Sequence, residues 1–417
     1  MFVDELEQWA GEPALIAESG EVISYAELAQ RADAWASRLG PDRGLLYLEA
    51  RTTVEAVVAY LGALRARWPV MWAASGHGEI EQRLVDSFRP ERLAFRREGK
   101  WMLDTRGPAG PLHPDLAVLL STSGSTGSPK LVRLSRDAVD ANARQIVEYL
   151  GITQHDRAVT SLPLGYSYGL SVLNSHLAAG ASVLLTARSV TDPEFWRFFR
   201  AWDATSIAGV PYSYELFERM GLRTDPPPSL RTMTQAGGRL SPELVATYAR
   251  WSREHGIRFF PMYGQTEATA RMAFLPPELA EAHPDCIGRP IPGGAFRLID
   301  EAGLEVDEAE TPGELIYRGP NVMMGYAFDR SDLAKGAELQ ALRTGDIAVR
   351  VAAGLYRIVG RASRFSKIAG KRISFEDLEK LLDARGEKAV VTGDDTMVAI
   401  WRSGTPEKDG EVRDQLA

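Results

Sequence analysis

A run of small and hydroxylated residues follows an apolar stretch at residues 119–134, which read LLSTSGSTGSPKLVRL. Gly124 and Gly127 permit backbone conformations and close approaches that other residues avoid. In such a turn, backbone N–H groups and hydroxyls can point into one concavity that suits the oxygens of a phosphate, and Lys130 adds a positive charge. These residue types therefore indicate phosphate binding.

Three better-known glycine motifs do not fit this stretch. The loop G-x-x-x-x-G-K-[ST] fails because Pro129 precedes the lysine and Leu131 follows it. The dinucleotide fingerprint requires a different spacing of Gly124 and Gly127. A nucleophile elbow requires glycine where Ser123 stands, and no histidine is suitably placed to complete a triad. A plain flexible linker remains an alternative for the segment taken alone.

Hydrophobic patterns on both sides of the loop predict the elements that must hold it. Residues 116–123 have the pattern of a buried strand, and residues 136–150 that of an amphipathic helix capped by Ser135. Such patterns alternate along the chain, which is typical of parallel sheets covered by helices. We predict further strands at 44–50, 68–74, 181–187, 204–210, 230–237 and 257–264, and helices at 26–39, 54–66, 193–202 and 241–256.

The pattern of predicted helices and strands changes toward the C-terminus. Short β patterns broken by Gly and Pro, from about 287 to 361, predict a small antiparallel sheet or β-barrel-like part. Residues 373–386 then form a helix pattern, and a strand pattern follows at 396–402. We therefore predict an α/β protein with a large domain over 1–361, followed by a small α+β domain over 362–417. That last part, with its roughly 55 residues, has too little material for a large core and looks truncated.

The bulk composition narrows the class of protein. The chain has 417 residues, 45% of them hydrophobic, which is enough for two or more packed units. Its net charge of -8 argues against nucleic-acid binding through a broad cationic surface. The N-terminus does not resemble a signal peptide, and no run reaches the ~18 apolar residues of a membrane span. With Cys286 as its one cysteine, expected to be a buried thiol, the chain is predicted to be cytoplasmic.

The glycine-rich loop is the first of six motifs that resemble one family. They are similar, in order and spacing, to motifs of the adenylate-forming enzymes, which include acyl- and aryl-CoA synthetases, firefly luciferase and the adenylation domains of peptide synthetases. The resemblance covers nearly the entire chain and is highly specific. Its motifs are STSGSTGSPK (121–130), QAGGRL (235–240), YGQTEAT (263–269), GELIYRGPNVMMGY (313–326), RTGDIA (343–348) and YRIVGRASRFSKIAGKRISFEDLE (356–379).

The resemblance implies a site for ATP and Mg²⁺. Lys130 and Thr266 would contact phosphate groups, while Glu267 and Thr126 would bind the metal. A carboxylate such as Asp346 can accept hydrogen bonds from both ribose hydroxyls. Each residue taken alone also has an ordinary structural explanation, as a turn, core or helix-start residue. The residues implied in nucleotide binding are Thr122, Ser123, Gly124, Ser125, Thr126, Gly127, Lys130, Ala236, Gly237, Gly238, Tyr263, Gly264, Gln265, Thr266, Asp346, Ile358 and Arg361.

The implied reaction is that of an acid–thiol ligase. A fatty or aryl carboxylic acid would attack the α-phosphate of ATP, and the acyl-adenylate would then pass its acyl group to a thiol. That thiol would belong to CoA or to the phosphopantetheine of an acyl or peptidyl carrier protein, and the sequence leaves both acceptors open. The basic segment 89–100 would either meet a CoA phosphate or form a solvated surface. The six histidines show no metal-ligand spacing, so Mg²⁺ is the only metal expected.

The substrate pocket is expected around three segments. The residues implied in substrate binding are Tyr166, Ser167, Gly169, Tyr212, Ala236 and Gly237. Amino-acid-activating relatives place an aspartate where Gly169 stands, and an ammonium group buried without that counterion would be costly. An α-amino acid is therefore disfavoured. The tyrosines at these positions have packing as an equally acceptable explanation.

Two departures from the family concern the C-terminal part. Ser363 occupies the hinge position, where relatives have Asp or Lys, and Lys367 falls where some relatives use a lysine in thiol transfer. The family's adenylation lysine, in a Pro-x-x-Gly-Lys type segment, has no counterpart before Ala417. We therefore expect either a truncated enzyme or, as the alternative, a protein that binds nucleotide or acyl-adenylate but adenylates poorly. A stand-alone amino-acid adenylation domain is a third possibility.

Overall fold

The computed structural model describes residues 1–74, 78–121, 130–362, 365–368, 371–383, 389–393 and 398–402. The chain forms two compact units, one comprising Met1–Phe296 with Tyr317–Leu342 and the other Arg297–Ile316 with Arg343–Ala417. The domain border expected after residue 361 stays a prediction. Within the described ranges, none of the helices is both long and apolar enough to cross a membrane.

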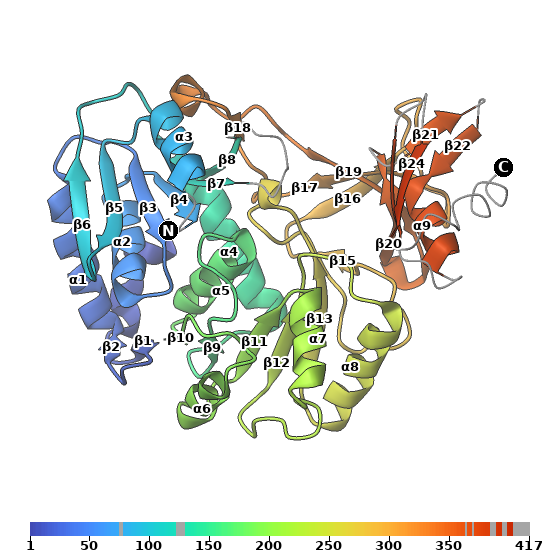
Figure 1. Cartoon of the computed structure of the whole chain (residues 1–417), viewed down its shortest axis with the longest axis horizontal. Helices are drawn as coiled ribbons and strands as arrows, with labels where there is room; N and C mark the ends of the chain where they lie inside the picture. Colours follow the sequence, from blue (N-terminus) through green and yellow to red (C-terminus); the bar gives the residue numbers. More distant parts are fainter. Residues whose placement is uncertain are drawn as a thin grey trace. The chain divides into compact units, whose positions relative to one another are not determined.

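One sheet of the first unit carries the strand that leads into the glycine-rich segment. Its strands are β3 (Leu46–Ala50), β4 (Val70–Ala74), β5 (Arg92–Arg97), β6 (Lys100–Thr105), β7 (Leu116–Ser121), β8 (Leu131–Ser135) and β18 (Gly325–Ala327). They run in the order β18-β8-β7-β4-β3-β5-β6 (Figure 1). The central pairs are parallel, and the pairs β5–β6, β7–β8 and β8–β18 are antiparallel. The strands predicted at 44–50 and 68–74 are confirmed, and the one predicted at 116–123 is confirmed up to Ser121, beyond which residues 122 and 123 lie outside the described residues.

A second sheet of the same unit contains the remaining predicted strands. Its strands are β1 (Pro13–Ala17), β2 (Val22–Ser24), β9 (Arg157–Val159), β10 (Ser182–Leu185), β11 (Ser206–Gly209), β12 (Thr232–Gln235), β13 (Arg258–Tyr263), β14 (Ala273–Phe274) and β15 (Arg289–Pro290). The order is β15-β14-β13-β12-β11-β9-β10-β1-β2, and all pairs from β13 to β1 are parallel. The mostly parallel α/β architecture is thus confirmed.

Two helices lie between these sheets. Helix α4 (Arg136–Leu150) packs on β7 and β8, α5 (Ser167–Ala178) packs on β9 and β10, and the two helices contact each other (Figure 1). Helix α4 begins as predicted, because the Ser135 hydroxyl accepts a hydrogen bond from the Ala138 N–H. Helix α5 was not predicted. Almost every residue of it is buried, so its sequence lacks the alternation of apolar and polar faces that marks a surface helix.

Other helices of the unit begin at side-chain caps, each worth ~1 kcal/mol. The cap residues Ser24, Thr53, Asp192 and Ser241 each accept a hydrogen bond from a backbone N–H of the first turn. The helices predicted at 26–39, 54–66, 193–202 and 241–256 are therefore confirmed, whereas α3 and α7 were not predicted. The helices are α1 (Tyr25–Leu39), α2 (Val54–Arg65), α3 (Gly78–Phe88), α6 (Pro193–Ala201), α7 (Pro211–Arg219) and α8 (Pro242–Glu254).

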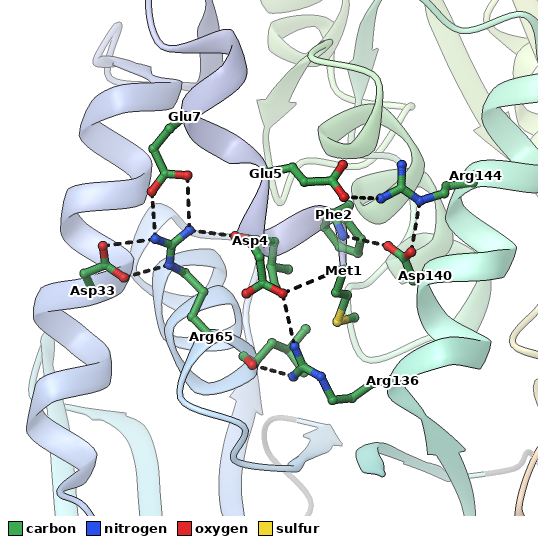
Figure 2. Close-up of polar contacts among 12 residues, drawn as sticks. Met1, Phe2, Asp4, Glu5, Glu7, Asp33, Arg65, Arg136, Asp140 and Arg144 are labelled. Carbon is green, nitrogen blue, oxygen red and sulfur yellow. Dashed lines mark hydrogen bonds and ion pairs between the residues drawn. The ribbon is translucent and has the colours of Figure 1, made fainter.

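The N-terminal segment is fastened to helices α1, α2 and α4 by charged side chains (Figure 2). Its two short 3₁₀ helices, Phe2–Asp4 and Leu6–Trp9, bury Phe2 and Leu6. Arg65 of α2 bonds both Glu7 and Asp33, and the Phe2 N–H donates to Asp140 of α4 at 2.6 Å. Single exposed ion pairs contribute little, but here one partly buried guanidinium serves two carboxylates.

A buried arginine fixes the short strand β18 against β8. The Arg133 side chain on β8 is fully buried and donates from Nε to the Tyr326 carbonyl at 3.1 Å. Its other nitrogens reach the Lys335 carbonyl and the Glu338 carboxylate, both at 2.5 Å. The register places Tyr326 opposite Val132. The segment that carries Tyr326 is thus held at several points.

The second unit is built around a four-stranded sheet in the order β16-β17-β19-β20. No closed barrel is found among the described residues, so the β-rich part expected there is a sheet. A smaller core follows, in which Phe375, Leu382 and Val391 pack together. The helix predicted at 373–386 is confirmed over Phe375–Asp383 and the strand predicted at 396–402 over Val398–Arg402, and residues 384–386 and 396–397 lie outside the described residues. The elements are β16 (Ala295–Ile299), β17 (Gly313–Arg318), β19 (Leu342–Arg350), β20 (Tyr356–Arg361), β21 (Phe365–Ile368), β22 (Lys371–Ser374), α9 (Phe375–Asp383), β23 (Ala389–Gly393) and β24 (Val398–Arg402).

Candidate active site

Three predicted site segments leave the second sheet at the same edge. Strands β11, β12 and β13 are parallel neighbours, and Gly209 lies opposite Gln235, which in turn lies opposite Pro261. The carboxyl ends of parallel strands form the usual ligand-binding edge of such a sheet. The residues that follow these strands include Tyr212, Ala236, Gly237, Gly238, Gly264, Gln265, Thr266 and Glu267.

The turn after β12 requires glycine because other groups press against it. Gly237 has a φ of +81°, and a Cβ there would lie 2.4 Å from the Tyr166 hydroxyl. A Cβ on Gly238 would lie 3.0 Å from Cγ of Pro211. Gln235 closes the turn by donating from Nε2 to the Gly238 carbonyl at 2.9 Å. The structure therefore brings together Tyr166 and Gly237, two of the residues predicted to bind substrate.

The start of helix α5 contributes two more predicted residues. Tyr166 is half-buried and makes an edge contact with Tyr168, with ring centroids 6.3 Å apart. Burial raises the pKa of Tyr166, so its hydroxyl stays protonated at neutral pH. The Ser167 hydroxyl lies 3.1 Å from that of Thr266 and links the helix to the loop after β13. Tyr212, by contrast, is 60% exposed, and among the described residues its side chain makes no hydrogen bond or ring contact with the other predicted residues.

Gly169 has a steric reason to be glycine. A Cβ at this position would lie 2.3 Å from the Pro163 carbonyl oxygen and 3.0 Å from that of Leu162. Any larger side chain, aspartate included, would therefore displace the backbone before α5.

The loop after β13 doubles back tightly. A Cβ on Gly264 would lie 1.7 Å from the Ala270 carbonyl oxygen, so glycine alone allows this approach. The short helix Thr266–Ala268 lies inside the loop, and Thr269 and Ala270 follow it with φ angles of 57° and 95°. Positive φ at two successive non-glycine residues is a strained arrangement that clusters at functional sites.

Asn321 holds this loop in place, although the sequence reasoning gave it no role. It is fully buried, and its Nδ2 donates to the carbonyls of Ala268 at 2.7 Å and Arg271 at 3.0 Å. Its Oδ1 accepts from the Tyr317 hydroxyl at 2.8 Å, and its own carbonyl accepts from Thr269 Oγ1 at 2.7 Å. All these bonds are internal, which suits a positioning group.

Tyr326 connects the predicted phosphate lysine to the predicted metal ligand. Its hydroxyl donates to Oε1 of Glu267 at 2.8 Å, and Nζ of Lys130 lies 3.6 Å from the centroid of its ring. Burial raises the pKa of Tyr326 above the usual range, and the hydrogen bond to Glu267 adds to this. The phenol therefore stays a donor at neutral pH. A cation and a carboxylate from distant segments meet through this one side chain.

The second unit contains its own pair of predicted residues. Nε of Arg361 donates to Oδ1 of Asp346 at 2.9 Å, and the two residues lie opposite each other on β20 and β19. Asp346 is buried and Arg361 is exposed. Ile358 pairs with Ala348 in the same ladder. A carboxylate and a guanidinium side by side can serve hydroxyl and phosphate groups respectively.

Several predicted residues cannot be placed. The segment Thr122 to Gly127 lies outside the described residues, as do Ser363 and the side chain of Lys367. Among the described residues, no cluster of three or more His, Cys, Asp or Glu side chains is arranged to hold a metal. Cys286 is buried and forms no disulfide, as expected.

Comparison with known proteins identifies the family. The model of a family described as "AMP-binding enzyme" matches residues 83–327. The chain belongs to the AMP-binding enzyme family. This match ends before β19 and β20, so Asp346 and Arg361 lie outside it, whereas Lys130, Glu267 and Tyr326 lie inside it.

The sequence identity between this AMP-binding enzyme and its individual relatives is modest. It is 31% identical to an oxalate–CoA ligase of Arabidopsis thaliana over 276 residues, which cover 65% of this chain and 53% of that protein. It is 26% identical to tyrocidine synthase 2 of Brevibacillus parabrevis over 95% of this chain and 12% of that protein. The chain spans about half the length of the curated CoA ligases that it matches.

The fold has a counterpart among solved structures. O-succinylbenzoate coenzyme A synthetase from Bacillus subtilis, in complex with AMP, superimposes with a TM-score of 0.79 at 23% identity, over 99% of this chain and 90% of that chain. At this identity the likeness shows the fold alone.

Proposed function

We propose that this AMP-binding enzyme is an acid–thiol ligase that activates a carboxylic acid with ATP. The observation that carries the proposal is the meeting of Lys130 and Glu267 at Tyr326. A phosphate-binding cation and a carboxylate suited to Mg²⁺ are the two groups that an ATP-dependent transfer needs close together. The names of the CoA ligase relatives support the same reaction class.

The nucleotide is proposed to bind along the edge where β11, β12 and β13 end. Lys130 and the hydroxyl of Thr266 contact phosphate oxygens, with backbone groups of Gly264 and Gln265 beside them. Ala236, Gly237 and Gly238 flank the adenine, and Tyr263 stacks on it. Thr122 to Gly127 stay predicted phosphate-binding residues. Asp346, Arg361 and Ile358 of the second unit stay predicted nucleotide-binding residues, with chemistry that suits ribose hydroxyls, ribose or phosphate, and an apolar contact respectively.

Glu267 is the proposed protein ligand of Mg²⁺, together with Thr126. The fit rests on the chemistry of the donor set, because carboxylate and hydroxyl oxygens are preferred by this ion and nucleotide phosphates commonly complete its coordination. Bound there, Mg²⁺ would neutralise charge on the phosphoryl oxygens. Tyr326 orients the carboxylate by its hydrogen bond.

The reaction proceeds in two steps. A carboxylate oxygen of the acid attacks the α-phosphorus of ATP, the bond to the β-phosphate oxygen breaks, and pyrophosphate leaves. A thiol sulfur then attacks the acyl carbon, AMP leaves, and the thiol proton passes to solvent or to AMP. The thiol belongs to CoA or to the phosphopantetheine of a carrier protein. We propose that residues 362–417 act as a mobile domain in the second step and that Lys367 contacts the thiol substrate there.

The acid is proposed to lie beside Tyr166 and Gly237, which touch each other and would form one wall of its site, with Ser167 and Tyr212 near its path. The class is a fatty or aryl acid rather than an α-amino acid. A counterion for an α-ammonium group is sterically excluded at Gly169, because its position lies against the Pro163 carbonyl.

A panel of carboxylic acids tests the proposal. Each acid is incubated with ATP, Mg²⁺ and CoA, and adenylate and thioester are identified by mass. We expect at least one acid to give both products, and the variants Lys130→Ala and Glu267→Gln to lose adenylate by about 100-fold or more. Absence of both products, together with no magnesium-dependent binding of ATP by calorimetry, would refute the function.

A further inference from the structure

Arg271 is a buried guanidinium that no carboxylate neutralises within the described ranges. The residue is 2% exposed. Its Nε donates to Ser171 Oγ and its Nη1 to the Tyr149 hydroxyl, both at 3.0 Å, and Nη2 makes no hydrogen bond to a described residue. Its Cζ lies 5.0 Å from the centroid of the Tyr168 ring. Every partner is electrically neutral, so the positive charge is uncompensated.

The surroundings make this charge unfavourable. Tyr168, Val172, Ala208 and Met262 belong to one buried apolar cluster at this place. Arginine does not lose its proton in proteins, so the fold cannot escape the charge by titration. Neutral hydrogen bonds and one aromatic face offset only part of the cost of taking an ion out of water. An anion bound beside the guanidinium would neutralise this charge.

Strained backbone residues and buried hydrogen bonds fix the position of Arg271. Arg271 directly follows the two strained residues Thr269 and Ala270. Its carbonyl accepts from Nδ2 of both Asn142, at 3.1 Å, and Asn321. Strain that is held by buried hydrogen bonds is characteristic of functional positions. A residue with only a packing role would not require this arrangement.

A small cavity adjoins the guanidinium. It has a volume of about 20 Å³ and is lined by Arg271 together with Val172, Ala208, Thr234 and, further along, His176 and Arg258. A cavity of this size accommodates one small polar group. Burial lowers the pKa of His176 to about 4, so the imidazole is neutral at pH 7 and adds no counter-charge.

Asp156 also lines this cavity, but both of its carboxylate oxygens already accept hydrogen bonds from other residues. Its Oδ1 accepts from the Thr205 hydroxyl at 3.1 Å and its Oδ2 from the Thr153 N–H at 2.8 Å. Among the described residues, no ion pair joins it to Arg271 or to Arg258, which is a second arginine without a paired acid. The cavity is therefore positively charged overall.

Ring contacts connect the proposed acyl site to the guanidinium that lines the cavity. Tyr166, which touches Gly237, makes an edge contact with Tyr168, and the Tyr168 ring lies against Arg271. Ala208 and Thr234 are in strands β11 and β12, whose carboxyl ends form the site edge. An acid held beside Tyr166 and Gly237 would thus have the Tyr168 ring between itself and Arg271, and its remote end would reach the guanidinium past this ring.

We propose that Arg271 is a specificity-determining residue that selects acids carrying a second carboxylate at the end remote from the reacting one. The inference rests on the proposed function, because it names the class of acid that this site accepts. The remote carboxylate occupies the cavity and accepts a charge-assisted hydrogen bond from Nη2, since Nε and Nη1 already donate to Ser171 and Tyr149.

Matched acid pairs test this selectivity. Hexanoate is compared with adipate, and 4-methylbenzoate with terephthalate, in ATP–pyrophosphate exchange by the wild-type chain. We expect the dicarboxylate of at least one pair to have a kcat/KM about 10- to 100-fold higher, the range for a charge-assisted hydrogen bond in a buried site. An equal or reversed preference in both pairs overturns the inference while leaving the ligase function intact.

Variants assign the preference to Arg271. Arg271→Met, of similar length, should remove the preference, measured as the ratio of the kcat/KM values for the dicarboxylate and the monocarboxylate, whatever its effect on kcat/KM for the monocarboxylate alone. Arg271→Lys should retain part of the preference. Arg253→Met, which removes an exposed arginine on α8, is the matched control and should change nothing. If Arg271→Met does not fold, the wild-type panel and Arg271→Lys decide. A preference that survives Arg271→Met overturns the assignment.

A binding measurement separates the two proposals. If no acid yields an adenylate, the proposed function fails, and calorimetry of adipate and hexanoate with the wild-type chain then decides the inference alone. Tighter binding of adipate that is lost in Arg271→Met supports it. Equal affinity for the two acids overturns it.

Discussion

The Tyr326 hydroxyl donates a hydrogen bond to Oε1 of Glu267 at 2.8 Å, while the other side of the same residue, its ring face, receives Nζ of Lys130. The two halves of the side chain thus serve different partners. Removing the hydroxyl separates these roles, because phenylalanine keeps the ring and loses the donor.

Tyr326→Phe should weaken the apparent Mg²⁺ affinity in pyrophosphate exchange by about 10-fold, since partners that orient a metal-binding carboxylate contribute to affinity on this scale. The measurement is exchange rate against Mg²⁺ concentration at saturating ATP. Tyr356→Phe, on β20 of the second unit, serves as control and should leave the curve unchanged. A Tyr326→Phe curve that superimposes on the wild type would show that the bond is incidental.

Gly264→Ala should destabilise the fold by about 3 kcal/mol and abolish ATP binding. The added Cβ would meet the Ala270 carbonyl oxygen, a backbone atom that cannot move aside without unmaking the strained loop. Gly11→Ala is the control, because a Cβ there would meet nothing within 4 Å, and its effect should stay within about 0.5 kcal/mol. Urea unfolding measures both. Equal stability of the two variants would contradict the close approach.

Asn321→Ala should cost about 3 kcal/mol of folding free energy, because three buried partners lose their hydrogen bonds at once. Gln8→Ala removes an exposed amide and should be near neutral. Thermal unfolding compares them. If nucleotide binding also weakens in Asn321→Ala at a temperature where the variant is fully folded, the residue positions the Glu267 loop, and unchanged binding would limit it to stability.

Stability should fall as the solution is acidified from pH 6.5 to about 4, and His176 should account for up to about 3 kcal/mol of that fall. Burial lowers its pKa to about 4, against 6.5 in an unfolded chain, so in this window the unfolded state binds more protons than the folded one. Above pH 6.5 both states are neutral at this group and its contribution is constant. His176→Gln should flatten the slope, measured by urea unfolding at several pH values, and an unchanged slope would exclude this origin.

Local signals in the sequence predicted most of the scaffold. Ser135 predicted a helix start that the structure confirms, and apolar runs marked the parallel strands. Helix α5 escaped because an all-buried helix shows no periodic contrast. The hairpin β5–β6 was not predicted, because its arginines and lysine mask the strand pattern. Residues 89–100 were interpreted only as a basic segment, either for a CoA phosphate or as a solvated surface.

The candidate site was predictable only in part. Motif order brought Lys130, Glu267, Gly237 and Tyr166 into one proposal, and the structure brings Tyr166 to Gly237 and Lys130 to within one side chain of Glu267. Tyr326, Asn321 and Arg271 were missed as site residues, although the first two stand inside a recognised motif. Their importance arises from contacts over long sequence separations, which no local pattern encodes.

The pairing of β18 with β8 has a further consequence. Side chains alternate between the two faces of a strand, so a slip by one position would turn the Tyr326 ring away from Lys130. Strand β18 has only three residues, so its own hydrogen bonds to β8 fix the register weakly. The Arg133 guanidinium donates to the Tyr326 carbonyl and so helps to hold the register of the two strands. Damage to this arginine would therefore misalign reacting groups that it never touches.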